Sequence, residues 1–288
     1  MSNDALVIRC SSTTTYPGCP RRWAAHNLSR EIRNAGYALR DTQNGIGAAV
    51  GISVHAAARA MNDENAATGK LPSASTATDI AVSTVKEEIA RGVEYDQTTT
   101  RTANEAEQQV ARMALSYRWD IAPTINAIAI EARFEAQIPW STQNIILSGQ
   151  PDIVAREPGK IDDLKTGARM GWHLCQIGAY SLVVRANQIA EIEEGQITWI
   201  PRVSVKKPQP APTTHRQSIA KAETVATNIL RAIDDAVRVW REGDEARGVL
   251  PGDPAAFMAN PTSQLCNPKY CRAHSAGANG WCTEWSAE

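Results

Sequence analysis

Apolar residues along the chain alternate between helical spacing and the two-residue period of strands. Long stretches with apolar positions three and four apart predict amphipathic helices. Shorter apolar runs bounded by Gly and Pro predict strands. The predicted helices cover residues 20–35, 45–61, 76–91, 104–119, 170–187 and 217–242, and the predicted strands cover residues 125–138, 148–154, 161–165 and 189–205.

Composition narrows the class of protein. The 288 residues are 43% hydrophobic, so we expect a packed core rather than global disorder. The formal net charge is −1, and any basic surface for nucleic acid must therefore be local. No apolar run is long enough to span a bilayer, and the first residues lack the pattern of a secretory signal. We expect a cytoplasmic protein with no membrane partner, whose six cysteines are reduced thiols or metal ligands.

The stretch Ser148 to Gly167 carries charged residues inside predicted strands. Two apolar-rich runs surround a Glu-Pro-Gly-Lys turn, which is typical of a hairpin. Strand propensity disfavours Asp, and such local conflicts concentrate at functional sites. Alternate strand residues share a face, so Asp163 and Lys165 lie on one side and Asp162 on the other. Asp152 on the neighbouring strand can face Asp163, which predicts a site for a hard cation beside a lysine.

These residues resemble a known nuclease signature. Asp152 followed by Asp163-Leu164-Lys165 resembles the motif of the PD-(D/E)xK nuclease superfamily. The extended string, Gly149-x-x-Asp152 and then Asp-Leu-Lys-Thr-Gly, resembles the RecB-like branch of that superfamily.

Two further motifs occur in the order that this branch shows. Gly51-x-x-x-His55 resembles its first motif, in which the histidine joins the metal shell. Gln176-x-x-x-Tyr180 resembles the motif that follows the catalytic lysine and serves the active site or DNA contact. Taken from the residues alone, His55 also fits a core histidine on an apolar helix, and the second motif also fits ordinary helix packing.

The resemblance implies a restriction-endonuclease-like α/β fold. It has a mixed central sheet flanked by helices, an N-terminal helical segment and a C-terminal cysteine loop. We expect one nuclease domain over residues 1–288. Its mainly helical part covers 20–120, its catalytic sheet core covers 125–205, and its long helix and cysteine tail cover 217–288.

The resemblance also implies the site residues. The expected ligands of Mg²⁺ or Mn²⁺ are His55, Asp152, Asp163 and the carbonyl of Leu164. The expected catalytic residues are Asp152, Asp163, Lys165, Gln176 and Tyr180. Glu131, inside the predicted strand 125–138, receives no role.

A group of cysteines near the C-terminus indicates a second metal site. Cys266, Cys271 and Cys282 lie in a tail rich in Pro, Gly, Asn and Ser, where little regular structure is expected. Soft thiolates select zinc or iron–sulfur clusters. The residues leave the fourth ligand open, because His274, Cys19 and Cys10 are all candidates.

A resemblance extends to this tail. AddB-type and CRISPR-associated iron–sulfur exonucleases are similar in placing one cysteine before the nuclease motifs and three after them. That order implies a [4Fe–4S] cluster held by Cys19, Cys266, Cys271 and Cys282, with zinc as the alternative. We expect the cluster to clamp the two ends of the chain rather than to act as a redox centre.

The implied activity is metal-dependent hydrolysis of DNA, most simply exonucleolytic processing of DNA ends in recombination or repair. The implied partners are DNA and recombination or annealing proteins, and we expect phosphate contacts from Arg21, Arg22, Lys206 and Lys207. The alternative is a non-catalytic DNA-binding or scaffold subunit with a zinc or iron–sulfur structural site. Such a subunit needs the cysteines but not the metal-site residues.

Overall fold

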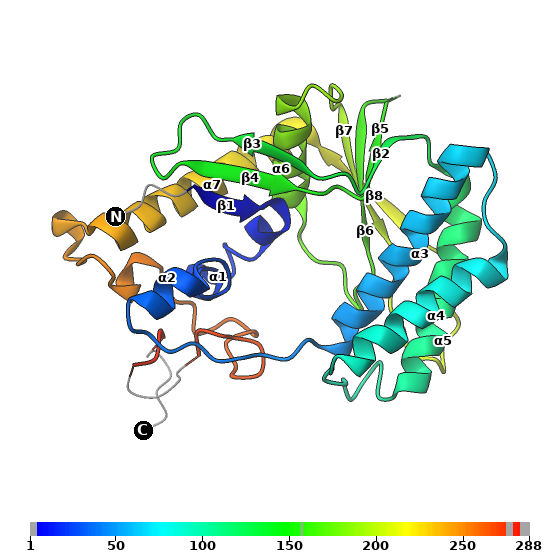
Figure 1. The fold of residues 1–288 in the computed structure, drawn as a ribbon, viewed down its shortest axis with the longest axis horizontal. Coiled ribbons are helices and arrows are strands. Elements are labelled where there is room, and N and C mark those ends of the chain that lie inside the picture. Colours follow the sequence, from blue (N-terminus) through cyan, green and yellow to red (C-terminus); the bar gives the residue numbers. More distant parts are fainter. Residues whose placement is uncertain (1–4, 157, 275–278, 283–288) are drawn as a thin grey trace.

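Helices cover two mixed sheets in the computed structural model, which describes residues 5–156, 158–274 and 279–282 (Figure 1). Helices α3, α4 and α5 lie together at one end of the molecule, and α1, α2 and the C-terminal loops lie at the other (Figure 1). The predicted α/β fold with helices flanking mixed sheet structure is confirmed. The strands form two sheets, however, rather than one central sheet.

The smaller sheet has three strands and the larger has five. The smaller has the order β1-β4-β3, with β1 parallel to β4 and β3 antiparallel to it. The larger has the order β2-β5-β6-β7-β8, in which only β6 and β7 are parallel. The strands are β1 Leu6–Arg9, β2 Ala127–Ile130, β3 Phe134–Gln137, β4 Ile145–Gly149, β5 Ile153–Ala155, β6 Lys160–Lys165, β7 Glu194–Trp199 and β8 Thr213–Ser218.

The prediction of one continuous strand over residues 125–138 is wrong, because the chain turns at Glu131. Glu131 has a φ of 43°, a left-handed conformation that interrupts the strand. Its backbone N–H donates to the carbonyl oxygen of Asp152 at 3.0 Å, outside the regular ladder. The two halves become β2 and β3 and enter different sheets, so this turn joins the sheets beside Asp152.

Seven α-helices lie in the described part of the chain. They are α1 Pro20–Asn27, α2 Ser29–Asn34, α3 Ile46–Thr68, α4 Ala74–Ala90, α5 Ala103–Ser116, α6 Leu174–Ala186 and α7 Ile219–Glu242. The helix predicted over 20–35 is broken at Leu28, where ψ departs from helical values. None of the helices in the described residues is long and apolar enough to cross a lipid bilayer.

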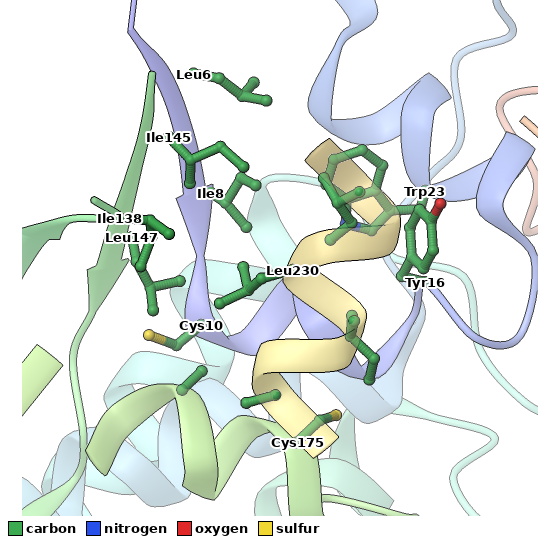
Figure 2. Packing of buried hydrophobic residues seen from close by; sticks show 14 of the residues in the cluster. Leu6, Ile8, Cys10, Tyr16, Trp23, Ile138, Ile145, Leu147, Cys175 and Leu230 are labelled. Carbon is green, nitrogen blue, oxygen red and sulfur yellow. The ribbon is translucent and has the colours of Figure 1, made fainter. Parts of the chain in front are cut away.

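Two apolar cores hold the sheets and helices together. In the larger, Ile8, Ile145 and Leu147 from the small sheet face Leu230 of α7 and Trp23 of α1 (Figure 2). The smaller core lies among α3, α4 and α5 and includes Leu164 of β6 and Ile200 just after β7. The helical end of the molecule is therefore packed directly on the strand that carries the acidic motif.

Helices α6 and α7 approach each other closely because Gly178 has no side chain. A Cβ atom at this position would lie 2.0 Å from the backbone oxygen of Ala222, a distance that packing does not permit. The close approach brings α6 against the core side of the sheet, where Gln176 and Tyr180 lie buried.

A buried carboxylate ties the β3–β4 connection to α7. Asp234 accepts hydrogen bonds from the Ser141 hydroxyl, from the Thr142 hydroxyl and backbone N–H, and from the Gln143 backbone N–H, at 2.6–3.1 Å. Burial alone raises the pKa of Asp234, but these hydrogen bonds outweigh it and hold that pKa below its ordinary value.

We predict that Asp234→Asn lowers the free energy of unfolding by about 1–3 kcal/mol at neutral pH, because an amide nitrogen cannot accept these bonds. A folded-state pKa below the unfolded value means that the stabilisation is present above about pH 3.9 and is lost as pH falls through the folded pKa. Denaturant titrations of both proteins between neutral and acidic pH measure this, with Asp79→Asn on the exposed face of α4 as the control. A stability difference that persists unchanged at low pH would show that the charge of Asp234 is not the cause.

Candidate active site

The hairpin β5–β6 separates the two adjacent aspartates, as strand alternation predicts. Asp162 accepts hydrogen bonds from Thr198 Oγ1 at 2.8 Å and Gln196 Nε2 at 2.7 Å, both on β7. Asp163 faces the opposite side, where its Oδ2 lies 2.6 Å from the Nζ of Lys165. Both carboxylates are buried, so each depends on these partners.

Helix α6 contributes Gln176 and Tyr180 to the site. Gln176 accepts a hydrogen bond from Lys165 Nζ at 3.1 Å and donates through Nε2 to Asp163 Oδ1 at 3.2 Å and to the Tyr180 hydroxyl at 2.8 Å. The spacing of four residues places Gln176 and Tyr180 on one helical face, as predicted. The fully buried Gln176 amide therefore connects the lysine, the aspartate and the tyrosine in one network.

Asp152 is held from two directions. It lies directly before β5, and its Oδ2 accepts the backbone N–H of Leu164 at 2.6 Å. Its Oδ1 lies 3.0 Å from the Nδ1 of His55 on α3. Helix α3 comes this close partly because Gly51 lacks a side chain, since a Cβ there would lie 3.1 Å from the Thr166 Oγ1. The hydrogen bond from Leu164 to Asp152 uses the backbone N–H of Leu164. The ligand role expected from the sequence belongs to the carbonyl of Leu164, which is a different group.

Glu131, to which the sequence motifs gave no role, lies at the candidate site. Ligand atoms of His55, Glu131 and Asp152 all lie within 4.8 Å of one another, close enough to hold one metal ion. Asp163 is not part of this compact group, because its carboxylate is turned toward Lys165. The available signal was an acidic residue in a predicted strand, which did not reveal that the chain turns there.

Burial and neighbouring charges shift the pKa values of this group, and His55 must release its proton before its imidazole can bind a cation. Burial alone lowers the pKa of His55, but the Asp152 carboxylate outweighs it and raises that pKa to about 9. Burial raises the pKa of Glu131, with the nearby Asp152 as a further cause. Burial likewise raises the pKa of Asp163 to about 6, against the opposing effect of Lys165. Carboxylate oxygens with one imidazole nitrogen form a donor set that fits Mg²⁺ or Mn²⁺.

His55, Glu131 and Asp152 line one groove of about 1060 Å³, which we call the active-site groove. Helix α3 lines one side through His55 and Ile52, and the corner of β1 lines the other through Arg9. Lys165 and Tyr180 also line it. A polymer can therefore reach the acidic group from outside.

The four cysteines of the predicted cluster line a separate pocket, which we call the cysteine pocket. Cys19 from the start of α1 and Cys266, Cys271 and Cys282 from the tail line it together with His274. Cys10 lies elsewhere, in the active-site groove. The structure thus brings Cys19, and not Cys10, to the tail cysteines.

Backbone and guanidinium groups surround these thiols. The Asn260 backbone N–H donates to Cys19 Sγ at 3.4 Å, and Arg21 Nη1 lies 4.0 Å from Cys282 Sγ. Arg21 is buried and also donates to the Phe257 carbonyl, which does not suit the phosphate contact predicted for it. His274 Nδ1 is buried without a hydrogen-bond partner in the described residues.

Comparison with known proteins places this geometry in a family. The sequence profile described as "PD-(D/E)XK nuclease superfamily" matches residues 10–276. The chain belongs to this superfamily. The matched range holds both halves of the acidic motif of this PD-(D/E)XK nuclease and the helices that support it.

Two solved structures are similar to this PD-(D/E)XK protein. One, from Eubacterium rectale, is described as a "putative exonuclease"; it is 13% identical over 92% of this chain and 87% of that chain, with a TM-score of 0.49. The other, SSO0001, is 10% identical over 80% of this chain and 78% of that chain, with a TM-score of 0.36. No curated protein matches this sequence. At these TM-scores the two structures say nothing about the substrate of this chain.

Proposed function

We propose that this protein is an Mg²⁺- or Mn²⁺-dependent DNA nuclease of the RecB-like branch, acting as an exonuclease on DNA ends in recombination or repair. One observation carries the proposal. Strands β5 and β6 and helices α3 and α6, from distant parts of the sequence, bring His55, Asp152 and Lys165 to one open groove, and the buried Asp163 contacts Lys165 beneath it. We further propose that residues 1–288 form a single nuclease domain, since the core of α3–α5 includes residues of the catalytic sheet.

The metal would be held by His55, Asp152 and Glu131, joined by Asp163 and the carbonyl of Leu164. A bound divalent cation polarises a phosphate and makes hydroxide available near neutral pH. The protein's own part is to hold the ligands in place. Asp152 is fixed by the Leu164 N–H and by His55, so its carboxylate is oriented before a cation binds.

Lys165 would act on the substrate rather than on the metal. Its ammonium group lies 2.6 Å from Asp163 and 3.1 Å from the Gln176 side-chain oxygen, and its side chain is 22% exposed. In that position it can orient the attacking water or neutralise charge that develops on the phosphate in the transition state. Gln176 positions the lysine, and Tyr180, whose ring lines the groove, fixes the amide of Gln176 in turn.

The assignment to the RecB-like branch rests on the motif order and on the cysteine pocket. We propose that Cys19, Cys266, Cys271 and Cys282 hold a [4Fe–4S] cluster. Thiolates bind both zinc and iron–sulfur clusters. The order of one cysteine before the nuclease motifs and three after them, with all four lining one pocket, supports the cluster.

A non-catalytic scaffold subunit fits less well. It requires the cysteine pocket alone and gives no reason for a lysine and three potential metal ligands to meet in a groove. The gathered site therefore favours the enzyme.

The test is a nuclease assay on anaerobically purified protein with Mn²⁺ and end-labelled single- and double-stranded DNA. We predict that linear DNA is degraded from its ends, that circular single strands and open circular duplexes stay intact, and that chelation of the metal stops the reaction. Cleavage of the circles would replace the exonuclease by an endonuclease. Intact linear DNA with every divalent metal tried would contradict the proposed function.

A further inference from the structure

The active-site groove continues into a second groove of about 750 Å³. Arg9 and Ser11, at the corner where β1 passes into the short helix η1 (Cys10–Thr14), line both grooves. Beyond this corner the second groove is lined by Arg22 and His26 of α1 and by Leu265 of the tail. A continuous path therefore leads from the proposed metal site to the edge of the cysteine pocket, which Arg22 also lines.

The charges along this path suit a polyanion. Among the residues that the structure describes, no Asp or Glu lines the second groove, whereas Arg9, Arg22 and His26 do. Neither Arg9 nor Arg22 has a hydrogen bond or ion pair from its side chain to another described residue. Some arginines elsewhere in the described residues are paired, as Arg202 is with Asp96 and Arg241 with Glu31. Two guanidinium groups without a side-chain partner in the described residues leave their donors available for phosphate.

Apolar side chains line the same groove. In β1, Leu6 and Ile8 are buried while Val7 and Arg9 face outward, so Val7 is 52% exposed in the second groove. Leu265 is 41% exposed in the same groove. A duplex presents mainly phosphate to such a surface, but an unpaired strand also presents the faces of its bases, which bind apolar side chains.

We propose that a single strand of DNA runs from the metal site over the corner at Arg9 and Ser11 and lies in the second groove against Arg22, Val7 and Leu265. The inference rests on the proposed function, because it takes the nuclease substrate as the occupant. The inference also assigns a structural role to the cysteine pocket. Leu265 directly precedes Cys266, and α1 begins directly after Cys19, so a cluster held by these cysteines would fix Leu265 and the start of α1 beside the second groove.

The experiment measures binding without cleavage, by fluorescence anisotropy in EDTA with labelled oligothymidines of about 6 and about 20 nucleotides. Only the longer strand reaches past the corner. We expect Arg9→Ala and Arg22→Ala each to weaken binding of the longer strand roughly fivefold or more and to lower the log–log salt slope by about 0.7. Binding of the short strand should change much less with Arg22→Ala. Arg30→Ala on α2, which is exposed and lines neither groove, is the matched control.

Further variants distinguish a loss of binding from a loss of folding. Arg22→Lys retains the charge and should retain the affinity, which a mere defect in folding does not predict. Should Arg22→Ala lose its fold or its metal content, Arg9→Ala on the exposed face of β1 still tests the path. A hairpin duplex with no overhang completes the set of ligands.

The outcomes separate this inference from the proposed function. Wild-type protein that binds long strands through Arg9 and Arg22 but cleaves no DNA supports the path and contradicts the nuclease proposal. Wild-type protein that cleaves DNA, with both variants binding the long strand as Arg30→Ala does, overturns the path and leaves the nuclease proposal standing. Equal losses for the blunt hairpin and the single strand overturn the assignment of a single strand.

Discussion

Asp163→Asn is expected to lower the rate of DNA cleavage by about 10²–10³-fold or more, and Asp162→Asn is expected to retain much of the activity. The two carboxylates are adjacent and both buried, so burial alone does not distinguish them. Asp163 shares its face of β6 with Lys165 and contacts it at 2.6 Å. Asp162 lies on the opposite face of β6 and accepts hydrogen bonds from Thr198 and Gln196 of β7.

Measurements of metal binding distinguish the role of Asp163 from that of Lys165. Asp163→Asn should weaken binding of Mn²⁺, because it removes a charged ligand from a hard cation. Lys165→Ala should abolish cleavage and leave Mn²⁺ binding nearly intact, because the ammonium group acts on phosphate and water. Calorimetric titration of Mn²⁺ into each variant measures this difference independently of cleavage.

Each variant must first match the wild type in circular dichroism, thermal unfolding and iron content. If Asp162→Asn is inactive and Asp163→Asn is active, the functional carboxylate is the one facing β7. If Asp163→Asn, Asp162→Asn and Lys165→Ala all cleave DNA at the wild-type rate, this hairpin is not the active site.

Local rules were enough to predict the centre of the site. The two-residue period of a strand separates Asp162 from Asp163, and the four-residue period of a helix pairs Gln176 with Tyr180. Both periods hold wherever the element forms, because they follow from backbone geometry. The hairpin and the faces of these side chains therefore follow from short stretches of sequence.

Features that depend on the conformation of one residue were not predictable in this way. The pattern over 125–138 predicts a single strand, yet Glu131 adopts a positive φ and carries its carboxylate to His55 and Asp152. Only contacts with distant residues select that conformation for a glutamate. Strand β8 was also missed, because its side chains are mostly exposed and no apolar alternation marks an edge strand of this kind.

The sequence also did not show which distant cysteine lies beside the tail cysteines. From the residues alone, the tail cysteines left Cys19, Cys10 and His274 as equal candidates for the fourth ligand. The structure places Cys10 behind β1 in the active-site groove and Cys19 at the start of α1 beside the tail. Which cysteine lies there is decided by how η1 and α1 pack against α7, and no spacing in the sequence records that packing.

The second large effect is expected from Cys19→Ala. Wild-type protein purified anaerobically should be brown and contain iron and sulfide, and Cys19→Ala should lose both. Cys19 and Cys266 are separated by roughly 250 residues, so their joint ligation closes a long loop. By comparison with other cross-links of long loops, the variant should lose about 3–5 kcal/mol of unfolding free energy. Urea titrations and iron analysis measure the two effects together.

Cys10→Ala is the matched control, since Cys10 is also buried and precedes Cys19 by only a few residues. Its thiol lies beside Gly149 and lines the active-site groove rather than the cysteine pocket, so the variant should keep its iron and its colour. Loss of iron from Cys10→Ala and retention in Cys19→Ala would reverse the ligand assignment. Colourless wild-type protein with stoichiometric zinc would instead favour a zinc site, and the buried, unpartnered Nδ1 of His274 would then become the ligand to replace next.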